Sequence, residues 1–276
     1  MEHILPLVRN VASLTLWLAI LAAIFVPLER IFSLRPRERR ETTASDIGYY
    51  FLNGLLPAAI LSIPLGFLAM VMRGLLPADY VATIVALPLW AKLLLGLIVS
   101  DFGSYWGHRW SHSNPVLWRF HAVHHDPTSV DWLVNSRAHP IDMVFTRLCG
   151  LAPLYALGLA DPGIDRTAMV PILVTLFGTV WTFFIHANVR WRFGPLEWLI
   201  STPAFHHWHH TNDEYRDHNF AAMLPLIDRA FGTAHLPKHW PPCYGIDEPV
   251  APTMRDQLLT PFGPTPKRRL VEPHSG

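Results

Sequence analysis

Histidines with helical spacing are the residues of this sequence that could do chemistry. Ten of the sixteen histidines fall in two short windows, residues 108–125 and 206–218. Eight of these ten lie three or four residues from one another: His108, His112, His121, His124, His125, His206, His209 and His210. Residues with this spacing share one face of a helix, so neighbouring imidazoles can bind one metal ion. Because eight ligands exceed what one ion can use, the pattern predicts two metal ions with coordination positions left open for a reactant.

The ligand type narrows the choice of metal without deciding it. Neutral imidazole binds zinc, copper, iron and nickel, whereas structural zinc sites are closed and usually rich in cysteine. The two cysteines, Cys149 and Cys243, lie outside the histidine boxes. An open di-iron site that activates O2 as a co-substrate is favoured, because cleavage of inert C–H bonds needs a metal that changes oxidation state. Zinc can still occupy the same ligands in a purified sample.

Further polar residues are expected to support this site. His186 follows a long apolar run and is predicted to be an additional ligand. Asp101 lies two helical turns before His108, and we expect its carboxylate to orient a ligand through the second imidazole nitrogen. The same supporting role is expected of His139, Asn188 and His218, with Asp217 and Asn219 as weaker candidates. His207, the intervening residue of the last box, is expected to face the surface or the substrate.

Composition and apolar runs indicate a membrane protein. Hydrophobic residues make up 51% of the chain and charged residues 16%, which is not the usual balance of a soluble domain. Five apolar runs approach the roughly 20 residues that a spanning helix needs, at 11–28, 49–72, 89–112, 144–160 and 168–185. The last two runs can also form a re-entrant hairpin. We therefore predict an all-α integral membrane protein with about four to five transmembrane helices and a cytoplasmic helical cap that holds the histidines.

Positive charge sets the expected orientation. The first run is followed by Arg30, Arg35, Arg37, Arg39 and Arg40, and the positive-inside tendency places this cluster in the cytoplasm. If each following span crosses the membrane in the opposite direction, both histidine windows lie on the cytoplasmic face. In a bacterium we expect this membrane to be the inner membrane. We expect an N-terminal transmembrane region at 1–88, a catalytic domain at 89–240 and a Pro-rich tail at 241–276, which is loosely ordered from Glu248 onward.

The three boxes resemble those of the fatty acid hydroxylase and sterol desaturase superfamily, in which HxxxH, HxxHH and HxxHH follow in this order. Here they read HRWSH at 108–112, HAVHH at 121–125 and HHWHH at 206–210, and similar segments cover roughly 90–235. The resemblance implies a di-iron, oxygen-dependent membrane enzyme that inserts a hydroxyl group or a double bond into a sterol, fatty acyl or alkyl lipid. The segment DWLVNSRAHP at 131–140 is similar to the bacterial sterol-desaturase-like and alkylglycerol monooxygenase branch.

Other features bear on partners and on a rival function. The sequence has no haem HPGG segment, flavin motif or GxGxxG loop. We therefore expect an external electron donor, a ferredoxin or a cytochrome b5-like protein with its reductase. A formal net charge of +1 gives no basic surface that would favour nucleic acid. The alternative is a histidine-rich membrane protein that binds or transports metal without oxygenase activity, and such a protein is expected to carry ligands near the middle of several spans.

Overall fold

Helices make up the regular structure of the described residues. This computed structural model describes residues 4–36, 43–161 and 169–263. The α-helices are α1 (Ile4–Phe32), α2 (Thr43–Leu75), α3 (Ala78–Ala86), α4 (Leu89–Ser113), α5 (Pro115–His125), α6 (Pro140–Ala156), α7 (Met169–His186), α8 (Pro203–His209), α9 (Pro225–Ala230) and α10 (Met254–Leu259). Three short 3-10 helices are η1 (Trp132–Ser136), η2 (Gly194–Trp198) and η3 (Thr260–Phe262). The predicted all-α class is confirmed.

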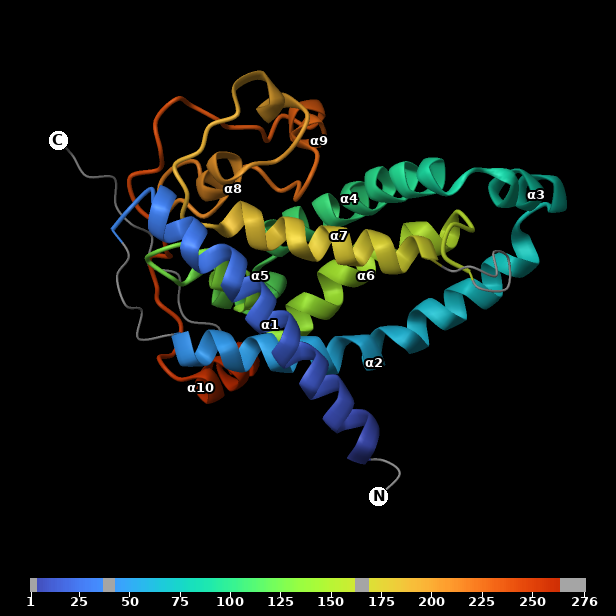
Figure 1. Cartoon of the computed structure of the whole chain (residues 1–276), viewed down its shortest axis with the longest axis horizontal. Coiled ribbons are helices and arrows are strands. Elements are labelled where there is room, and N and C mark those ends of the chain that lie inside the picture. Colours follow the sequence, from blue (N-terminus) through green and yellow to red (C-terminus); the bar gives the residue numbers. More distant parts are fainter. Residues whose placement is uncertain (1–3, 37–42, 162–168, 264–276) are drawn as a thin grey trace.

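Long helices form a bundle with short helices at one end. α2, α4, α6 and α7 run alongside one another, and α3 lies at the far end of α2 and α4 (Figure 1). The short helices α5, α8, α9 and α10 gather at the opposite end (Figure 1). We call this second end, residues 114–139 and 187–263, the cap. The bundle and the cap meet where α4 and α7 end.

In the described part of the chain, three helices are long and apolar enough to cross a membrane: Leu5–Phe32 of α1, α2 and α7. α3 and α4 meet the same criteria as a pair bent by 111°, which makes up to four candidate spans among the described residues. The bend falls at Pro88, where α4 was predicted to begin, because proline cannot continue a helix from the preceding residues. α6 has only 17 residues and is not a candidate, so the expected upper count of five is not reached.

Asn114 joins α4 to α5 and keeps the first two histidine boxes adjacent. Its side-chain oxygen accepts the backbone N–H groups of Val116 at 2.8 Å and Leu117 at 3.3 Å, which caps α5. Pro115 occupies the first turn of α5, where no helical hydrogen bond is needed. One helix therefore ends and the next begins within two residues.

Glycines let α4 and α6 approach closely. A Cβ atom at Gly103 would lie 2.2 Å from the backbone oxygen of Cys149, and one at Gly150 would lie 2.4 Å from Ser104 Oγ. Any larger residue at Gly103 would push against the α6 backbone. This close packing places the first turn of α6 beside the end of α4, where Ser111 Oγ lies 3.4 Å from Asp142 Oδ1.

Buried carboxylates tie the first two helices to the cap. Glu29 of α1 accepts the backbone N–H of Asn188 at 2.9 Å. Asp46 of α2 pairs with Arg137 at 3.3 Å, and Arg137 also pairs with Asp126 at 2.9 Å. Since Arg137 is only 1% exposed, removing a partner would leave a buried charge poorly compensated.

The tail was expected to be loosely ordered, and this is wrong for its described part. Gln257 of α10 is buried and accepts the hydroxyl of Tyr49 at 3.1 Å, which fixes α10 to the start of α2. Proline does not prevent this packing because it stands where helices begin, as Pro261 does in η3. Residues 264–276, and the predicted cytoplasmic arginines Arg37, Arg39 and Arg40, lie outside the described residues.

Candidate metal centre

Nine histidines gather into two groups where the bundle meets the cap. The five-histidine group contains His108, His112, His121, His125 and His209, and the four-histidine group contains His124, His186, His206 and His210. Within each group, one nitrogen of every ring lies within 4.8 Å of the others. The structure thus brings together all nine histidines for which a ligand role was predicted.

Both α5 and α8 contribute to both groups. In HAVHH, His121 and His125 belong to the five-histidine group and His124 to the other. In HHWHH the assignment is reversed. His206 and His210, four residues apart, belong to the four-histidine group, and His209 belongs to the five-histidine group. Helical residues four apart differ by about 40° around the axis and residues three apart by about 60° in the opposite sense. The second and third boxes therefore each contribute histidines to both groups.

The ring nitrogen facing away from the group is hydrogen-bonded in six of the nine histidines. Nδ1 lies 2.7–2.9 Å from a backbone carbonyl oxygen in His108 (Phe220), His124 (Arg137), His186 (Thr182) and His209 (His218). Nδ1 lies 3.0 Å from Asp142 Oδ2 in His121 and 3.1 Å from Asp217 Oδ1 in His112. These oxygens only accept, so each Nδ1 carries the proton and each Nε2 turns a lone pair toward its group.

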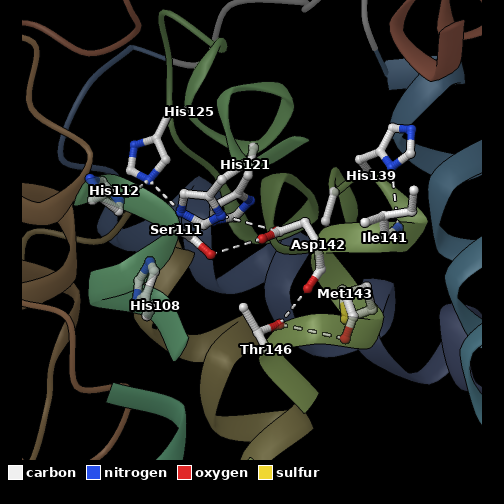
Figure 2. A network of polar contacts seen from close by, with 12 residues as sticks. His108, Ser111, His112, His121, His125, His139, Ile141, Asp142, Met143 and Thr146 are labelled. Carbon is white, nitrogen blue, oxygen red and sulfur yellow. Dashed lines mark hydrogen bonds and ion pairs between the residues drawn. The ribbon is translucent and has the colours of Figure 1, made fainter. Parts of the chain in front are cut away.

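Several Nε2 atoms within each group lie within hydrogen-bond distance of one another. His125 Nε2 is 3.2 Å from Nε2 of both His112 and His121, as Figure 2 shows. His186 Nε2 is 3.2 Å from His124 Nε2. Since both of these rings are protonated on Nδ1, no proton lies between them. A cation at the centre would turn the repulsion into coordination, and the donor set therefore fits a metal ion.

Burial favours the neutral imidazole in five histidines of the cap by lowering their pKa values. Burial, with a smaller effect of His121, lowers the pKa of His124 to about 4. The pKa values of His125, His206, His209 and His210 fall well below 6.5, again mainly through burial. Neutral imidazole is the form that binds metal. Moreover, Nε2 of His209 is buried with no hydrogen-bond partner among the described residues, and a metal ion would satisfy it.

Comparison with known families agrees with this geometry. The model of the fatty acid hydroxylase family matches residues 93–233, about half of the chain. The chain belongs to the fatty acid hydroxylase family. The resemblance predicted from the histidine boxes is confirmed.

Several curated relatives share this part of the chain. The ornithine lipid hydroxylase OlsE of Rhizobium tropici is 34% identical over 67% of this chain and 54% of its own length. Human alkylglycerol monooxygenase is 30% identical over 58% of this chain and 34% of its own length. Methylsterol monooxygenase 2-2 of Arabidopsis thaliana is 28% identical over 67% of this chain and 65% of its own length. The chain therefore spans about half or less of the first two relatives. No solved structure is significantly similar to it.

In this member of the fatty acid hydroxylase family, Asp101 does not contact a histidine ring as expected. Its carboxylate accepts three consecutive backbone N–H groups, at 222–224, over 2.7–3.2 Å. These follow Phe220, whose carbonyl oxygen binds His108 Nδ1 at 2.8 Å. Two helical turns, a rise of about 10.5 Å, separate Asp101 from His108, which is too far for direct contact. Asp101 instead holds the loop that orients His108.

Two of the expected supporting residues do contact the site. His218 contributes its backbone carbonyl to His209 Nδ1, whereas its ring lies 3.1 Å from the Tyr215 carbonyl. Asp217, a weaker candidate, accepts from His112 Nδ1. The support given by His218 therefore comes from the chain path and not from the imidazole.

The other expected supporting residues act away from the rings. His139 caps α6 by accepting the N–H of Ile141 at 3.1 Å, and it has no hydrogen bond to the nine histidines within the described ranges. The Asn188 amide bonds to the backbone of Arg35. Asn219 donates to the carbonyl oxygens of Phe205 and His235. All three fasten chain segments around the site.

His207 is buried, not surface-facing or substrate-facing as expected. Its exposed fraction is 0%, and its nitrogens lie 2.8 Å from the Tyr244 hydroxyl and 3.1 Å from the Ala187 carbonyl. It points away from the other α8 histidines because it is one residue, about 100° of helix, from His206. Its role is to bind the C-terminal part of the cap to the end of α7.

Asp142 is a supporting residue that sequence reasoning missed. It lies in the first turn of α6 and is 6% exposed. It accepts from His121 Nδ1 at 3.0 Å, and Figure 2 marks this contact by a dashed line. No helical spacing links it to His121, which is 21 residues earlier. The available signal was its place two residues after Pro140, the proline of the HP pair at 139–140 that starts a helix after the second box.

A cavity of about 270 Å³ adjoins both groups. Its walls come mainly from α4, α6 and α7. It reaches His108 and His121 of the five-histidine group and His124, His186 and His206 of the four-histidine group. An apolar hollow between α4 and α7 shares Val174 with this cavity and is lined by exposed side chains such as Phe177. The two spaces are therefore neighbours, with Val174 in the wall of both.

Proposed function

We propose that this chain is a membrane-bound di-iron, oxygen-dependent oxidoreductase that hydroxylates or desaturates a lipid. The observation that carries the proposal is the pair of histidine groups, whose Nε2 atoms converge beside a cavity between the bundle helices. The five-histidine group is proposed to hold one ion and the four-histidine group the other. Three, four or five imidazoles per ion leave room for a reactant in most iron geometries.

Two iron ions bound there would supply oxygen activation and C–H cleavage. The protein supplies the rest. Oxygen acceptors behind the rings fix their orientation, which preserves the geometry of the donor set. Burial of the cap histidines excludes bulk water from the site. The cavity orients the lipid, and the position of its C–H bonds before the histidines decides between hydroxylation and desaturation.

A lipid substrate is supported by the family and by the relatives. Their names refer to an ornithine lipid, an alkylglycerol and a methylsterol, three chemically different membrane lipids. What these compounds share is that they reside in a bilayer. The apolar hollow between α4 and α7 offers such a compound a way in from the membrane.

We further infer a cytoplasmic site in a bacterial inner membrane, with an external ferredoxin or cytochrome b5-like donor. Arg30 and Arg35 stand at the cap end of α1, and Arg35 donates to the carbonyl of Pro241 in the cap. The positive-inside tendency therefore favours a cytoplasmic cap. A donor would reach the histidines from this side.

Oxygen uptake and lipid profiling test the proposed activity. Iron-loaded protein with a donor system and membrane lipid extract should consume oxygen and yield a lipid that has gained one oxygen atom or lost two hydrogens. His124→Ala should abolish both signals, whereas His239→Ala, an exposed histidine outside the two groups, should retain them. Unchanged lipids and no oxygen uptake with any donor tried would refute the activity.

A further inference from the structure

Arg147 brings a cation into the cavity beside the histidines. It lies in the middle of α6, whose cavity-lining residues are Asp142, Met143, Thr146, Arg147, Gly150 and Leu151. These residues form pairs of neighbours that recur every four positions, so they all lie on one side of α6, and this side forms the wall. The opposite walls come from α4 and α7.

The Arg147 guanidinium has no hydrogen bond or ion pair to the described part of the chain. Other arginines near the bundle are paired: Arg73 lies 2.6 Å from Asp161, and Arg137 lies 2.9 Å from Asp126. An ionised side chain in a membrane-embedded bundle is unfavourable unless it faces a polar group. The unpaired guanidinium therefore indicates that the cavity receives an anion.

The carboxylates that line the same cavity are already engaged. Asp142 accepts from His121 Nδ1 at 3.0 Å and from Ser111 Oγ at 3.4 Å. Asp101 accepts the three backbone N–H groups at 222–224. Asn135 of η1 also lines the cavity, and its amide has no hydrogen bond within the described residues. Among the described residues that line it, the cavity thus presents one free cation, Arg147, and one free amide, Asn135.

We propose that Arg147 binds an oxyanion of the lipid substrate, a carboxylate or a phosphate, with Asn135 as a second polar contact. A guanidinium suits this task because its planar set of N–H donors matches two oxygens of such a group. The substrate class is therefore an acidic amphiphile. This inference rests on the proposed function, and it names the substrate of that same site.

The position of Arg147 also restricts which carbon is attacked. Arg147 follows Asp142 by five residues, a rise of about 7.5 Å along α6, and Asp142 contacts His121 directly. An anion held by Arg147 therefore lies near the metal site. The carbon in front of the histidines is then close to the acidic group, and the remaining apolar chain extends into the hollow between α4 and α7.

Binding of amphiphiles that differ only in headgroup tests this inference. Dodecanoate, dodecyl phosphate and 1-dodecanol share one chain length, and inorganic phosphate serves as the anion without a chain. By calorimetry of the full-length, iron-loaded protein in non-ionic detergent, we expect an anionic amphiphile to bind at least about tenfold more tightly than the alcohol. Arg147→Gln should remove this preference and Arg147→Lys should keep part of it. Arg190→Gln, at an exposed arginine, is the matched control and should behave as the wild type.

Each outcome decides for or against the inference. A preference for one or both anions that is lost in Arg147→Gln supports it, and the better anion identifies the headgroup. Equal binding of the three amphiphiles by the wild type overturns the inference. This comparison needs no variant, so it remains decisive even if Arg147→Gln folds poorly. An unchanged preference in Arg147→Gln overturns it too, as does inorganic phosphate that binds as tightly as dodecyl phosphate.

Oxygen uptake on the same samples separates this inference from the proposed function. Protein that consumes oxygen with a lipid but ignores headgroup charge contradicts only the role of Arg147. Protein that prefers anionic amphiphiles but never consumes oxygen contradicts only the oxygenase proposal.

Discussion

Oxygen atoms behind the histidine rings decide which nitrogen each ring turns toward its group. Four of these acceptors are backbone carbonyls, which side-chain substitution cannot remove. The two others are carboxylates: Asp142 is 6% exposed, whereas the side chain of Asp217 is 68% exposed. A buried carboxylate interacts more strongly with an imidazole N–H than an exposed one does, because water screens it less. Asp142 is therefore the acceptor whose removal should matter most.

Asp142→Asn should weaken metal binding by about 10- to 100-fold in the five-histidine group. The amide still fits beside His121 but no longer stabilises the metal-bound imidazole by its charge. Competition with a chelator of known affinity measures the change. Asp79→Asn, at the exposed start of α3, should leave the affinity unchanged. Equal affinity of the Asp142 variant and the wild type would show that the Asp142 charge does not support metal binding through His121.

His207 and His209 lie two residues apart and should respond oppositely to replacement. His209→Ala removes a proposed ligand and should lower the metal content. His207→Ala should keep the metal but lower the free energy of unfolding by about 1–3 kcal/mol, because the buried Ala187 carbonyl and Tyr244 hydroxyl lose their partner. Metal analysis and unfolding in mixed micelles measure both effects. Equal metal loss in the two variants would place His207 within the site, against its observed hydrogen bonds.

Single residues could be predicted where the signal is local. The nine clustered histidines stand out by spacing or by position at the end of an apolar run, and both depend only on nearby residues. The contact of Asp142 with His121 depends on how α6 packs, so no local pattern reveals it. Asp101 was placed correctly on α4 by helical spacing. That spacing could not show that its carboxylate accepts backbone N–H groups from the distant loop at 222–224.

At the scale of elements, the crossing of α4 and α6 positions the supporting carboxylate. Gly103→Ala would place a Cβ 2.2 Å from the Cys149 carbonyl oxygen, so α6 would have to move. We expect a loss of about 1–3 kcal/mol in the free energy of unfolding, as for other overpacked sites, together with weaker metal binding. Gly66→Ala in α2 is the control, because a Cβ there meets nothing within 4 Å. A Gly103→Ala protein with full stability and metal affinity would show that the close crossing is not required.

Element boundaries were predictable where proline or apolar length sets them. Pro88 starts α4 as expected, and the long runs at 11–28, 49–72 and 168–185 correspond to α1, α2 and α7. The division of each HxxHH box between two groups was not anticipated. This division depends on where the other histidine-bearing helices lie. Helical spacing tells which side chains share a face, but not the position of those other helices.

For the whole molecule, the side of the membrane on which the cap lies is a separate prediction. Cys243 is exposed in the cap, and a membrane-impermeant maleimide should label it in inverted inner-membrane vesicles but not in intact spheroplasts. Cys149→Ser removes the other cysteine, which is partly buried. Labelling in spheroplasts alone would reverse the proposed orientation.

The overall assembly was only partly readable from the sequence. Membrane character and an all-helical fold follow from composition. The packing of α10 on α2 and the link from Glu29 to the segment after α7 were not foreseen, because they join residues more than 150 positions apart. Such pairings depend on the path of the chain through the whole bundle.

The central claim is that the nine histidines hold two iron ions, one in each group. Anaerobic loading with iron-57, followed by metal quantification and Mössbauer spectroscopy, tests it most directly. We expect two iron ions per chain in the wild type, in line with the two groups, and loss of one of them in His206→Ala, which removes a ligand of the four-histidine group only. A single iron per chain in the wild type, or a stoichiometry that His206→Ala leaves unchanged, would contradict the claim.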